Sequence, residues 1–137
     1  MKLLIDTNFI LDIILERQPF YSNSVKVLSL AKKEDVEEYI SASAVTDVSY
    51  LLYRQLKDKG RAKELLRELF EIVSVAGVTD LEIQKAMELE WKDFEGSVQY
   101  AVALLQEMNG IVTRNPSGYG ESEILVWLPE KVLELIN

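Results

Sequence analysis

The sequence predicts an α/β domain in which helices surround a parallel sheet of five strands. Short apolar runs alternate along the chain with longer stretches whose apolar residues recur at helical spacing. The first run, Lys2–Ile5, has no polar residue after Lys2, which is typical of a central strand buried on both faces. With 137 residues the chain is long enough for one core, so we expect a single domain over residues 1–137.

The strands are predicted from short runs of strand-forming residues that are bounded by turn signals. Gly77 follows the third run, and Asn109-Gly110 comes just before the fourth. The predicted strands are Lys2–Ile5, Glu38–Ala42, Ile72–Val75, Ile111–Thr113 and Ile124–Leu128.

The helices are predicted between these strands, where apolar residues recur every three or four positions. Ser43 and Thr79 are expected N-caps, because their side chains can accept a hydrogen bond from the first turn. Gly60 is expected to end the third helix, and Pro129 to open the last one at its favoured first position. The predicted helices are Phe9–Glu16, Ser22–Lys33, Ser43–Lys59, Arg61–Glu71, Asp80–Trp91, Phe94–Met108 and a final helix from Pro129.

Composition excludes several kinds of chemistry. The chain has no histidine, which excludes zinc sites of the usual kind and Ser-His-Asp catalysis. It has no cysteine, which excludes disulfides and thiolate chemistry and fits a reducing compartment. Without a long apolar stretch or an N-terminal signal pattern, we expect a cytoplasmic protein that does not enter a membrane. Hydrolysis would have to use carboxylates around a hard divalent cation.

The net charge of −8 argues against a general binder of polyanions. It leaves room for nucleic acid at a single site, because a bound metal ion can reverse the field locally.

Asp6 is the first candidate for function, because it lies where the first strand ends. Ligands of parallel sheets gather outside the carboxyl ends of the strands. Thr7 and Asn8 follow as capping candidates for the helical pattern that begins at Phe9. Asp6 is therefore either a helix cap or a functional carboxylate.

Asp47 is the second candidate and lies early in the long third helix. At helical spacing it shares a stripe with Tyr50, Leu51 and Arg54. A carboxylate on a partly apolar stripe is either paired or a ligand. The alternative is an aspartate that the field of the helix N-terminus favours.

The third segment, Lys92–Leu104, contains Asp93, a possible cap, and Glu95, which suits a first helical turn. Gly96 is unusual here, because glycine inside a helix costs about 1 kcal/mol relative to alanine. It either permits a close backbone approach or marks a position that another side chain has vacated.

The fourth segment, Ile111–Gly120, leads from a strand into Thr113, Arg114 and Asn115. Arg114 can meet a phosphate, and Asn115 can bind metal-bound water or a backbone group. The alternative is a structural turn, for which Asn-Pro and Ser-Gly are common signals.

In order and spacing, LLIDTNFILD, SASAVTD, KDFEGSVQYA and IVTRNPSGY resemble the motifs of the PIN-domain family. RQPFYSNS and VWLPEKVL are similar to one bacterial branch, so the resemblance covers nearly the whole chain. It implies a three-layer α/β/α sandwich around a mainly parallel sheet. It also implies Mg²⁺- or Mn²⁺-dependent cleavage of single-stranded RNA, often by the VapC-type toxin of a toxin–antitoxin pair.

The resemblance assigns Asp6 and Asp47 to the family's first two metal-binding acids. It assigns Asn115, with Thr113, to the polar residues at the end of the fourth strand. The residues expected to bind substrate or support the site are Asn8, Thr113, Arg114 and Asn115.

Two positions depart from the family's pattern, because Gly96 and Gly118 stand where it usually has acids. Asp93 is the better substitute for the acid at position 96. At about 100° per residue, Asp93 points about 60° away from that position, whereas Glu95 points about 100° away. We therefore expect a catalytic and metal-binding set of Asp6, Asp47 and Asp93 that holds Mg²⁺ or Mn²⁺ weakly.

Three interpretations remain at this point. One is an altered endoribonuclease, and another is a non-catalytic PIN-fold module that binds RNA or protein. The last is a phosphoryl-transfer domain of the haloacid dehalogenase or response-regulator type. Haloacid dehalogenases need a second aspartate where this chain has Asn8, and the paired acids and lysine of receiver domains are not evident.

The expected partners are single-stranded RNA, an antitoxin protein and a second copy of the chain. Tyr50 and Tyr53 lie outside the apolar stripe of their helix. Either both are exposed and suit a homodimer contact, or both are core residues. RNA would enter along Arg17, Lys92 and Arg114.

Overall fold

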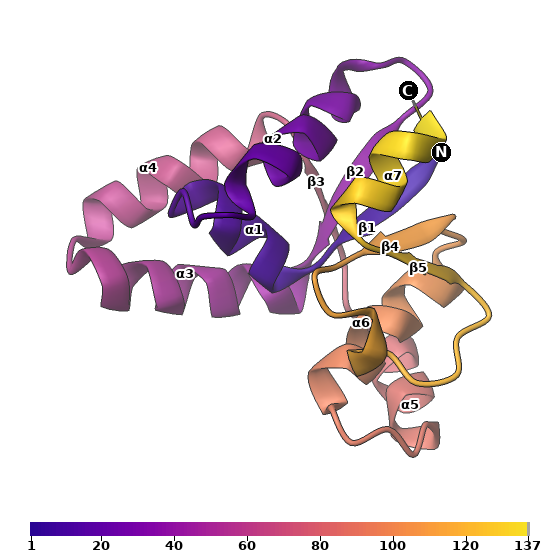
Figure 1. The fold of residues 1–137 in the computed structure, drawn as a ribbon. Helices are drawn as coiled ribbons and strands as arrows, with labels where there is room; N and C mark the ends of the chain where they lie inside the picture. Colours follow the sequence, from indigo (N-terminus) through magenta and orange to yellow (C-terminus); the bar gives the residue numbers. More distant parts are fainter. Residues whose placement is uncertain (137) are drawn as a thin grey trace.

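The computed structural model describes residues 1–136, and a parallel five-stranded sheet lies at its centre (Figure 1). The strands are β1 (Lys2–Ile5), β2 (Glu37–Ser41), β3 (Ser74–Ala76), β4 (Gly110–Val112) and β5 (Leu125–Trp127). Their order is β3-β2-β1-β4-β5, and every neighbouring pair is parallel.

The predicted place of β1 at the centre of the sheet, next to β4, is confirmed. Leu3, Leu4 and Ile5 are fully buried. Leu3 and Ile5 pack into the core on one face of the sheet and Leu4 into the core on the other, as the alternation of a strand requires. The apolar run at the start of the chain therefore supplies both cores.

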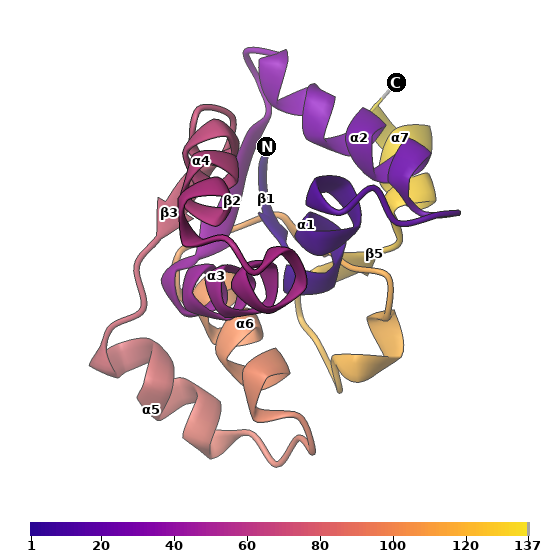
Figure 2. The same ribbon diagram turned by 90° about the vertical axis from the view of Figure 1, so that its left-hand side faces the viewer.

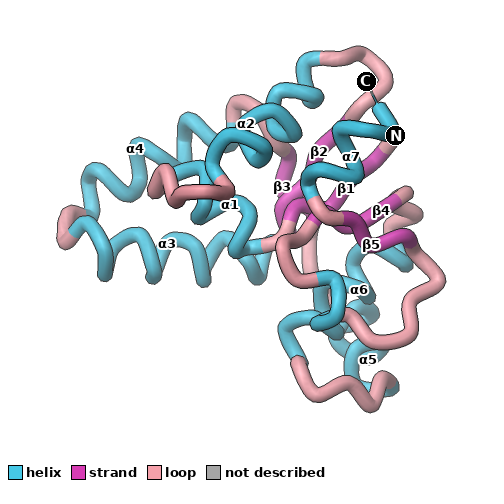
Figure 3. Tube along the Cα trace, in the orientation of Figure 1, coloured by secondary structure: helices cyan, strands magenta, loops and turns pink. Residues whose placement is uncertain are grey.

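Helices cover both faces, which gives the three-layer architecture that the resemblance implies. The helices are α1 (Thr7–Ile14), α2 (Tyr21–Ser29), α3 (Ala42–Leu56), α4 (Lys59–Phe70), α5 (Asp80–Glu88), α6 (Phe94–Leu105) and α7 (Pro129–Ile136). One core packs α1 to α4 and α7, and the other packs α5 and α6 (Figures 2 and 3). No helix within residues 1–136 combines the length and apolarity needed to cross a membrane.

The boundaries of the third predicted helix are wrong at both ends. Ser41 is the N-cap of α3, and its hydroxyl accepts a hydrogen bond from the Ala44 N–H at 3.1 Å. Ser43 lies inside the first turn instead.

At the other end, Lys57 has a left-handed backbone (φ 55°) that stops α3. Asp58 then caps α4, so Gly60 lies in the first turn of that helix and does not end α3. The predicted roles of Thr79, which forms a capping box with Glu82, and of Pro129 are confirmed.

A buried carboxyl group lies in the core of the sheet. Glu38 in β2 pairs in register with Leu3 and is 3% exposed. Neither of its carboxyl oxygens has a hydrogen-bond partner among residues 1–136. Burial raises the pKa of Glu38 to about 8, so the folded protein holds this group protonated at neutral pH.

We predict that Glu38→Met stabilises the protein more at about pH 8 than at about pH 5. The folded pKa of about 8 lies above the ordinary value of 4.5. The stability of the natural chain is therefore full below about pH 4.5 and falls as the pH rises toward 8, by up to about 1.4 kcal/mol per pH unit. The variant lacks this ionisation, so the difference in free energy of unfolding should widen by a few kcal/mol.

Urea unfolding at the two pH values measures this difference. Glu68→Gln, which changes an exposed carboxylate of α4, should leave it near zero. A difference for Glu38→Met that is the same at both pH values would contradict the prediction.

Candidate active site

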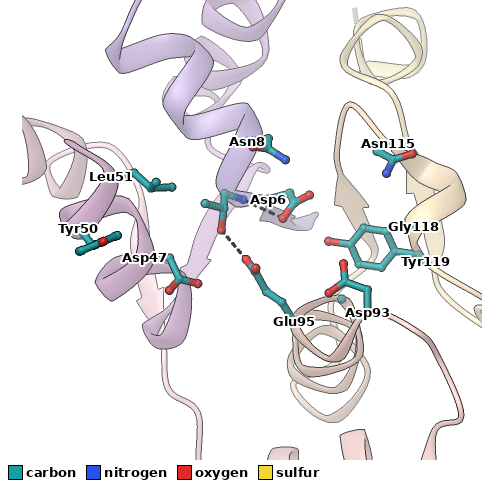
Figure 4. A pocket seen from close by; sticks show the side chains of 12 residues that line it. Asp6, Asn8, Asp47, Tyr50, Leu51, Asp93, Glu95, Asn115, Gly118 and Tyr119 are labelled. Atoms are coloured by element: carbon teal, nitrogen blue, oxygen red, sulfur yellow. Dashed lines mark hydrogen bonds between the residues drawn. The ribbon is translucent and has the colours of Figure 1, made fainter. Parts of the chain in front are cut away.

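A pocket of about 310 Å³ opens at the carboxyl end of β1 and β4, where the motifs of the sequence meet (Figure 4). Asp6, Asp47 and Asn115 line this one pocket, as predicted. Its lining residues are Asp6, Thr7, Asn8, Asp47, Tyr50, Leu51, Asp93, Glu95, Gly96, Asn115, Gly118 and Tyr119.

Asp6 is both a helix cap and a pocket residue. It is the N-cap of α1, where one carboxylate oxygen accepts a hydrogen bond from the Thr7 N–H at 2.8 Å. Its other oxygen accepts one from the Thr113 hydroxyl at 2.8 Å. Thr7 and Asn8 therefore lie in the first turn of α1 and are not its caps. Burial raises the pKa of Asp6, and these hydrogen bonds offset part of that rise.

Thr113 supports the pocket from beneath, because it is 1% exposed and is not among the lining residues. Its hydroxyl donates to Asp6 and accepts from the Asn115 N–H at 3.1 Å. It thereby fixes the start of the loop that brings Asn115 to the pocket.

The acidic side chains come from three helices or their caps and crowd one space (Figure 4). The Glu95 carboxylate accepts a hydrogen bond from the Thr7 hydroxyl at 3.1 Å. Burial raises the pKa of Glu95, and the negative charges of Asp47, Asp6 and Asp93 raise it further. This mutual repulsion is the electrostatic sign of a site that favours a cation.

The two glycine positions have close polar neighbours. A Cβ on Gly96 would lie 3.3 Å from Oδ2 of Asp93 and 3.3 Å from the carbonyl oxygen of Gly118. A Cβ on Gly118 would lie 3.1 Å from the amide nitrogen of Asn115. Asp93 occupies the N-cap position of α6 without making a side-chain cap hydrogen bond. Its carboxylate thus lies beside the position that the family's third acid would occupy.

Tyr119 is a pocket residue that the sequence analysis missed. Its side chain is 7% exposed, and its hydroxyl faces the Asp6 carboxylate, where it lowers the pKa of that acid (Figure 4). Burial and the nearby charges of Asp6, Glu95 and Asp93 raise the pKa of Tyr119, which keeps the hydroxyl protonated as a donor. An edge contact with Trp91 holds the ring. In the sequence, the signal for this role was a tyrosine that directly follows the polar residues 114–118.

Arg114 lies outside this pocket. It pairs with Asp12, a carboxylate that was not among the predicted site residues. Its Nε is 2.5 Å from Oδ2 of Asp12, which is fully buried in α1. Burial raises the pKa of Asp12, and the charges of Arg114 and then Arg17 offset part of the rise. An aspartate within the apolar stretch ILDIIL needs such a partner, and this was the signal for it.

The oxygen donors of the pocket are of the type that Mg²⁺ and Mn²⁺ prefer. Among residues 1–136, however, no three acidic side chains lie close enough together to hold an ion as they stand.

Comparisons with known proteins agree with the motifs. A family profile for the PIN domain matches residues 2–117. The ribonuclease VapC1 of Aquifex aeolicus is 28% identical to this chain, and the alignment covers 99% of this chain and 96% of that protein.

Solved structures share the fold at low sequence identity. A chain of the Rickettsia felis VapBC2 complex with promoter DNA matches with a TM-score of 0.73 at 15% identity, covering 93% of this chain and 98% of that one. A chain of a Klebsiella pneumoniae toxin–antitoxin complex matches with a TM-score of 0.70 at 18% identity, covering 93% and 97%. Mycobacterium tuberculosis VapC20, a toxin that cleaves the sarcin–ricin loop, matches with a TM-score of 0.65 at 17% identity, covering 90% and 98%.

We predict that Tyr119→Phe raises the pKa of Asp6 further, because it removes a nearby hydroxyl that favours the charged carboxylate. Carbon-detected NMR titration of the aspartate carboxyl groups measures this. Tyr100→Phe is the matched control, since this buried tyrosine does not line the pocket and its hydroxyl accepts a hydrogen bond from the Glu123 N–H. An unchanged Asp6 pKa in Tyr119→Phe would show that the hydroxyl does not stabilise the carboxylate.

Proposed function

This chain belongs to the PIN domain family, and from that premise we propose that it is an endoribonuclease for single-stranded RNA with a weakened Mg²⁺ or Mn²⁺ site. The observation that carries the proposal is the convergence of Asp6, Asp47 and Asp93 on one pocket. The similarity to a ribonuclease over nearly the full length of both chains supports it.

Each pocket residue has a proposed task. Asp6, Asp47 and Asp93 would hold the cation, which when bound would activate water and neutralise charge on the phosphodiester. Thr113 orients the Asp6 carboxylate through its hydroxyl hydrogen bond, and the Tyr119 hydroxyl favours the charged form of that carboxylate. Asn8 and Asn115 offer amide groups to the RNA phosphate at the rim.

The weakness of the site follows from Gly96 and Gly118. Two fewer carboxylates lower the affinity for a hard cation, because charge and oxygen ligands are what retain it. The same change lowers repulsion among the acids when no metal is bound, which favours the metal-free fold.

A non-catalytic module that binds RNA or protein is the second candidate. It is favoured by the Asp6 carboxylate, whose two oxygens accept hydrogen bonds from Thr7 and Thr113 without any cation. Cleavage of RNA that depends on Asp6 would exclude it.

We also propose an antitoxin partner and a cytoplasmic location, because related folds include a chain of a toxin–antitoxin complex. A homodimer through α3 is proposed as well. Tyr50 and Tyr53 are 61% and 42% exposed, so they are not core residues. They line a pocket in which their aromatic rings lie among polar and basic side chains, and exposed tyrosines of this kind suit a self-contact. The other lining residues are Thr46, Ser49, Lys59, Ala62 and Lys63.

The proposed homodimer through α3 can be tested by its oligomeric state in solution. The natural chain should be a dimer at tens of micromolar, and Tyr50→Glu with Tyr53→Glu should give a folded monomer, since it places charge in the aromatic contact. Light scattering measures the mass. Leu81→Glu with Met87→Glu on α5, which alters side chains of similar exposure, should leave the dimer intact. A monomeric natural chain would remove the proposal.

The metal site makes a sharper prediction, which uses the double variant Gly96→Asp with Gly118→Asp. Mg²⁺ should raise its melting temperature by mass action, whereas the natural chain should respond little. The new side chains can be accommodated mainly by movement of Asp93 and Asn115, whose side-chain ends are the nearest side-chain atoms. RNA cleavage should increase in the variant and be lost when Asp6→Asn is added.

Gly77→Asp is the matched control, because a Cβ there meets nothing within 4 Å and lies outside the pocket. Strong Mg²⁺-dependent cleavage by the natural chain, lost in Asp6→Asn, would contradict the weakened site. It would show that Asp93 or Glu95 fully replaces the missing acid.

A further inference from the structure

A second pocket, of about 290 Å³, adjoins the candidate active site through consecutive residues of one loop. Arg114 lines it, whereas Asn115 lines the acidic pocket. We propose that it binds a nucleobase of the single-stranded RNA whose phosphodiester occupies the acidic pocket, which rests on the proposed function. Its lining residues are Phe20, Ser24, Arg114, Leu128, Pro129 and Glu130.

Asp12 holds Arg114 in an orientation suited to this task. The ion pair uses Nε of Arg114, which is buried, and the arginine side chain as a whole is 29% exposed. The terminal nitrogens of the guanidinium are not needed for that pair. Because Asp12 balances the charge of Arg114 and Glu130 adds a negative one, the pocket favours a neutral base over a phosphate.

Phe20 supplies the aromatic surface of the pocket. Its ring is 37% exposed, and Cζ of Arg114 lies 4.0 Å from the ring centroid. Unpaired bases of RNA stack on aromatic rings and on guanidinium planes, and this pair presents both together.

Polar groups in the same pocket can meet the edge of a base. The Ser24 hydroxyl is fully buried and has no hydrogen-bond partner among residues 1–136. The Glu130 carboxylate accepts a hydrogen bond from the Asn23 amide at 3.1 Å through one oxygen. An unpaired buried hydroxyl is costly, and a base edge carries the donors and acceptors that would satisfy it.

The loop connects the two pockets. Arg114 lines one and the next residue, Asn115, lines the other, so an RNA strand that crosses this loop can meet both. The base bound at Phe20 therefore belongs to the same RNA strand as the phosphate held at Asp6.

The test measures binding of a short fluorescein-labelled RNA of mixed sequence, and of a set in which each nucleotide in turn is abasic. Fluorescence anisotropy is recorded in Mg²⁺ buffer at low temperature, and RNA integrity is checked afterwards. For the natural chain, one abasic position should weaken binding about 10-fold. Phe20→Leu should weaken binding of the intact RNA by a similar factor and remove the sensitivity to that position. Phe20→Trp should restore both the binding of the intact RNA and the sensitivity to that abasic position.

Phe70→Leu is the matched control, because Phe70 is 38% exposed at the end of α4 and lies outside the pocket. If RNA binds but Phe20→Leu behaves like Phe70→Leu, the base subsite is overturned while the proposed function stands. Phe20 would then be free to serve a protein partner. If no RNA binds to the natural chain, both proposals fail.

Discussion

Asp6 has to cap α1 and face the pocket with the same carboxylate, because β1 ends at Ile5 and the helix begins at Thr7. The fully buried strand leaves little freedom in where this residue lies. One oxygen satisfies the helix terminus, and the other receives the Thr113 hydroxyl from the end of the neighbouring strand β4. The pairing of β1 with β4 therefore sets the geometry of the acid as well as the sheet. Burial disfavours the charged form of Asp6, and the hydrogen-bond donors around it offset part of this effect.

When several acids lie near Asp6, cation binding and the stability of the metal-free pocket make opposite demands on them. Each carboxylate that would help to hold a cation also raises the pKa of its neighbours when no cation is present, as Glu95 illustrates. Gly96 and Gly118 relieve this opposition by leaving out charge. Tyr119 relieves it differently, because its nearby hydroxyl lowers the pKa of Asp6 without any metal. Fewer charges and a nearby hydroxyl both favour the pocket when it holds no ion, which is the physical basis of the weakened site that we propose.

The strands and the convergence of Asp6, Asp47 and Asn115 could be predicted, because they depend on local patterns and on the motif order. The caps of α3 and α4 could not be decided so well. Ser41 and Ser43 are equally good caps in isolation, and only the end of β2 selects Ser41. The partner of Arg114 could not be predicted from the sequence for a similar reason. Asp12 lies far along the chain, and only the pairing of β1 with β4 brings the loop of Arg114 over α1.

That loop is tied to both ends of α1. Thr113 bonds to Asp6 at the start of the helix, and the next residue, Arg114, pairs with Asp12 in its last turn. Two anchors on one helix leave the loop little freedom to tilt, since movement at one end would strain the other. Each anchor includes a residue that lines a pocket, because Asp6 lines the acidic pocket and Arg114 lines the pocket at Phe20. The buried ion pair of Asp12 and Arg114 is therefore better explained by the fixed relation it imposes between the pockets than by the stability it adds, because burying such a pair costs about as much as it returns.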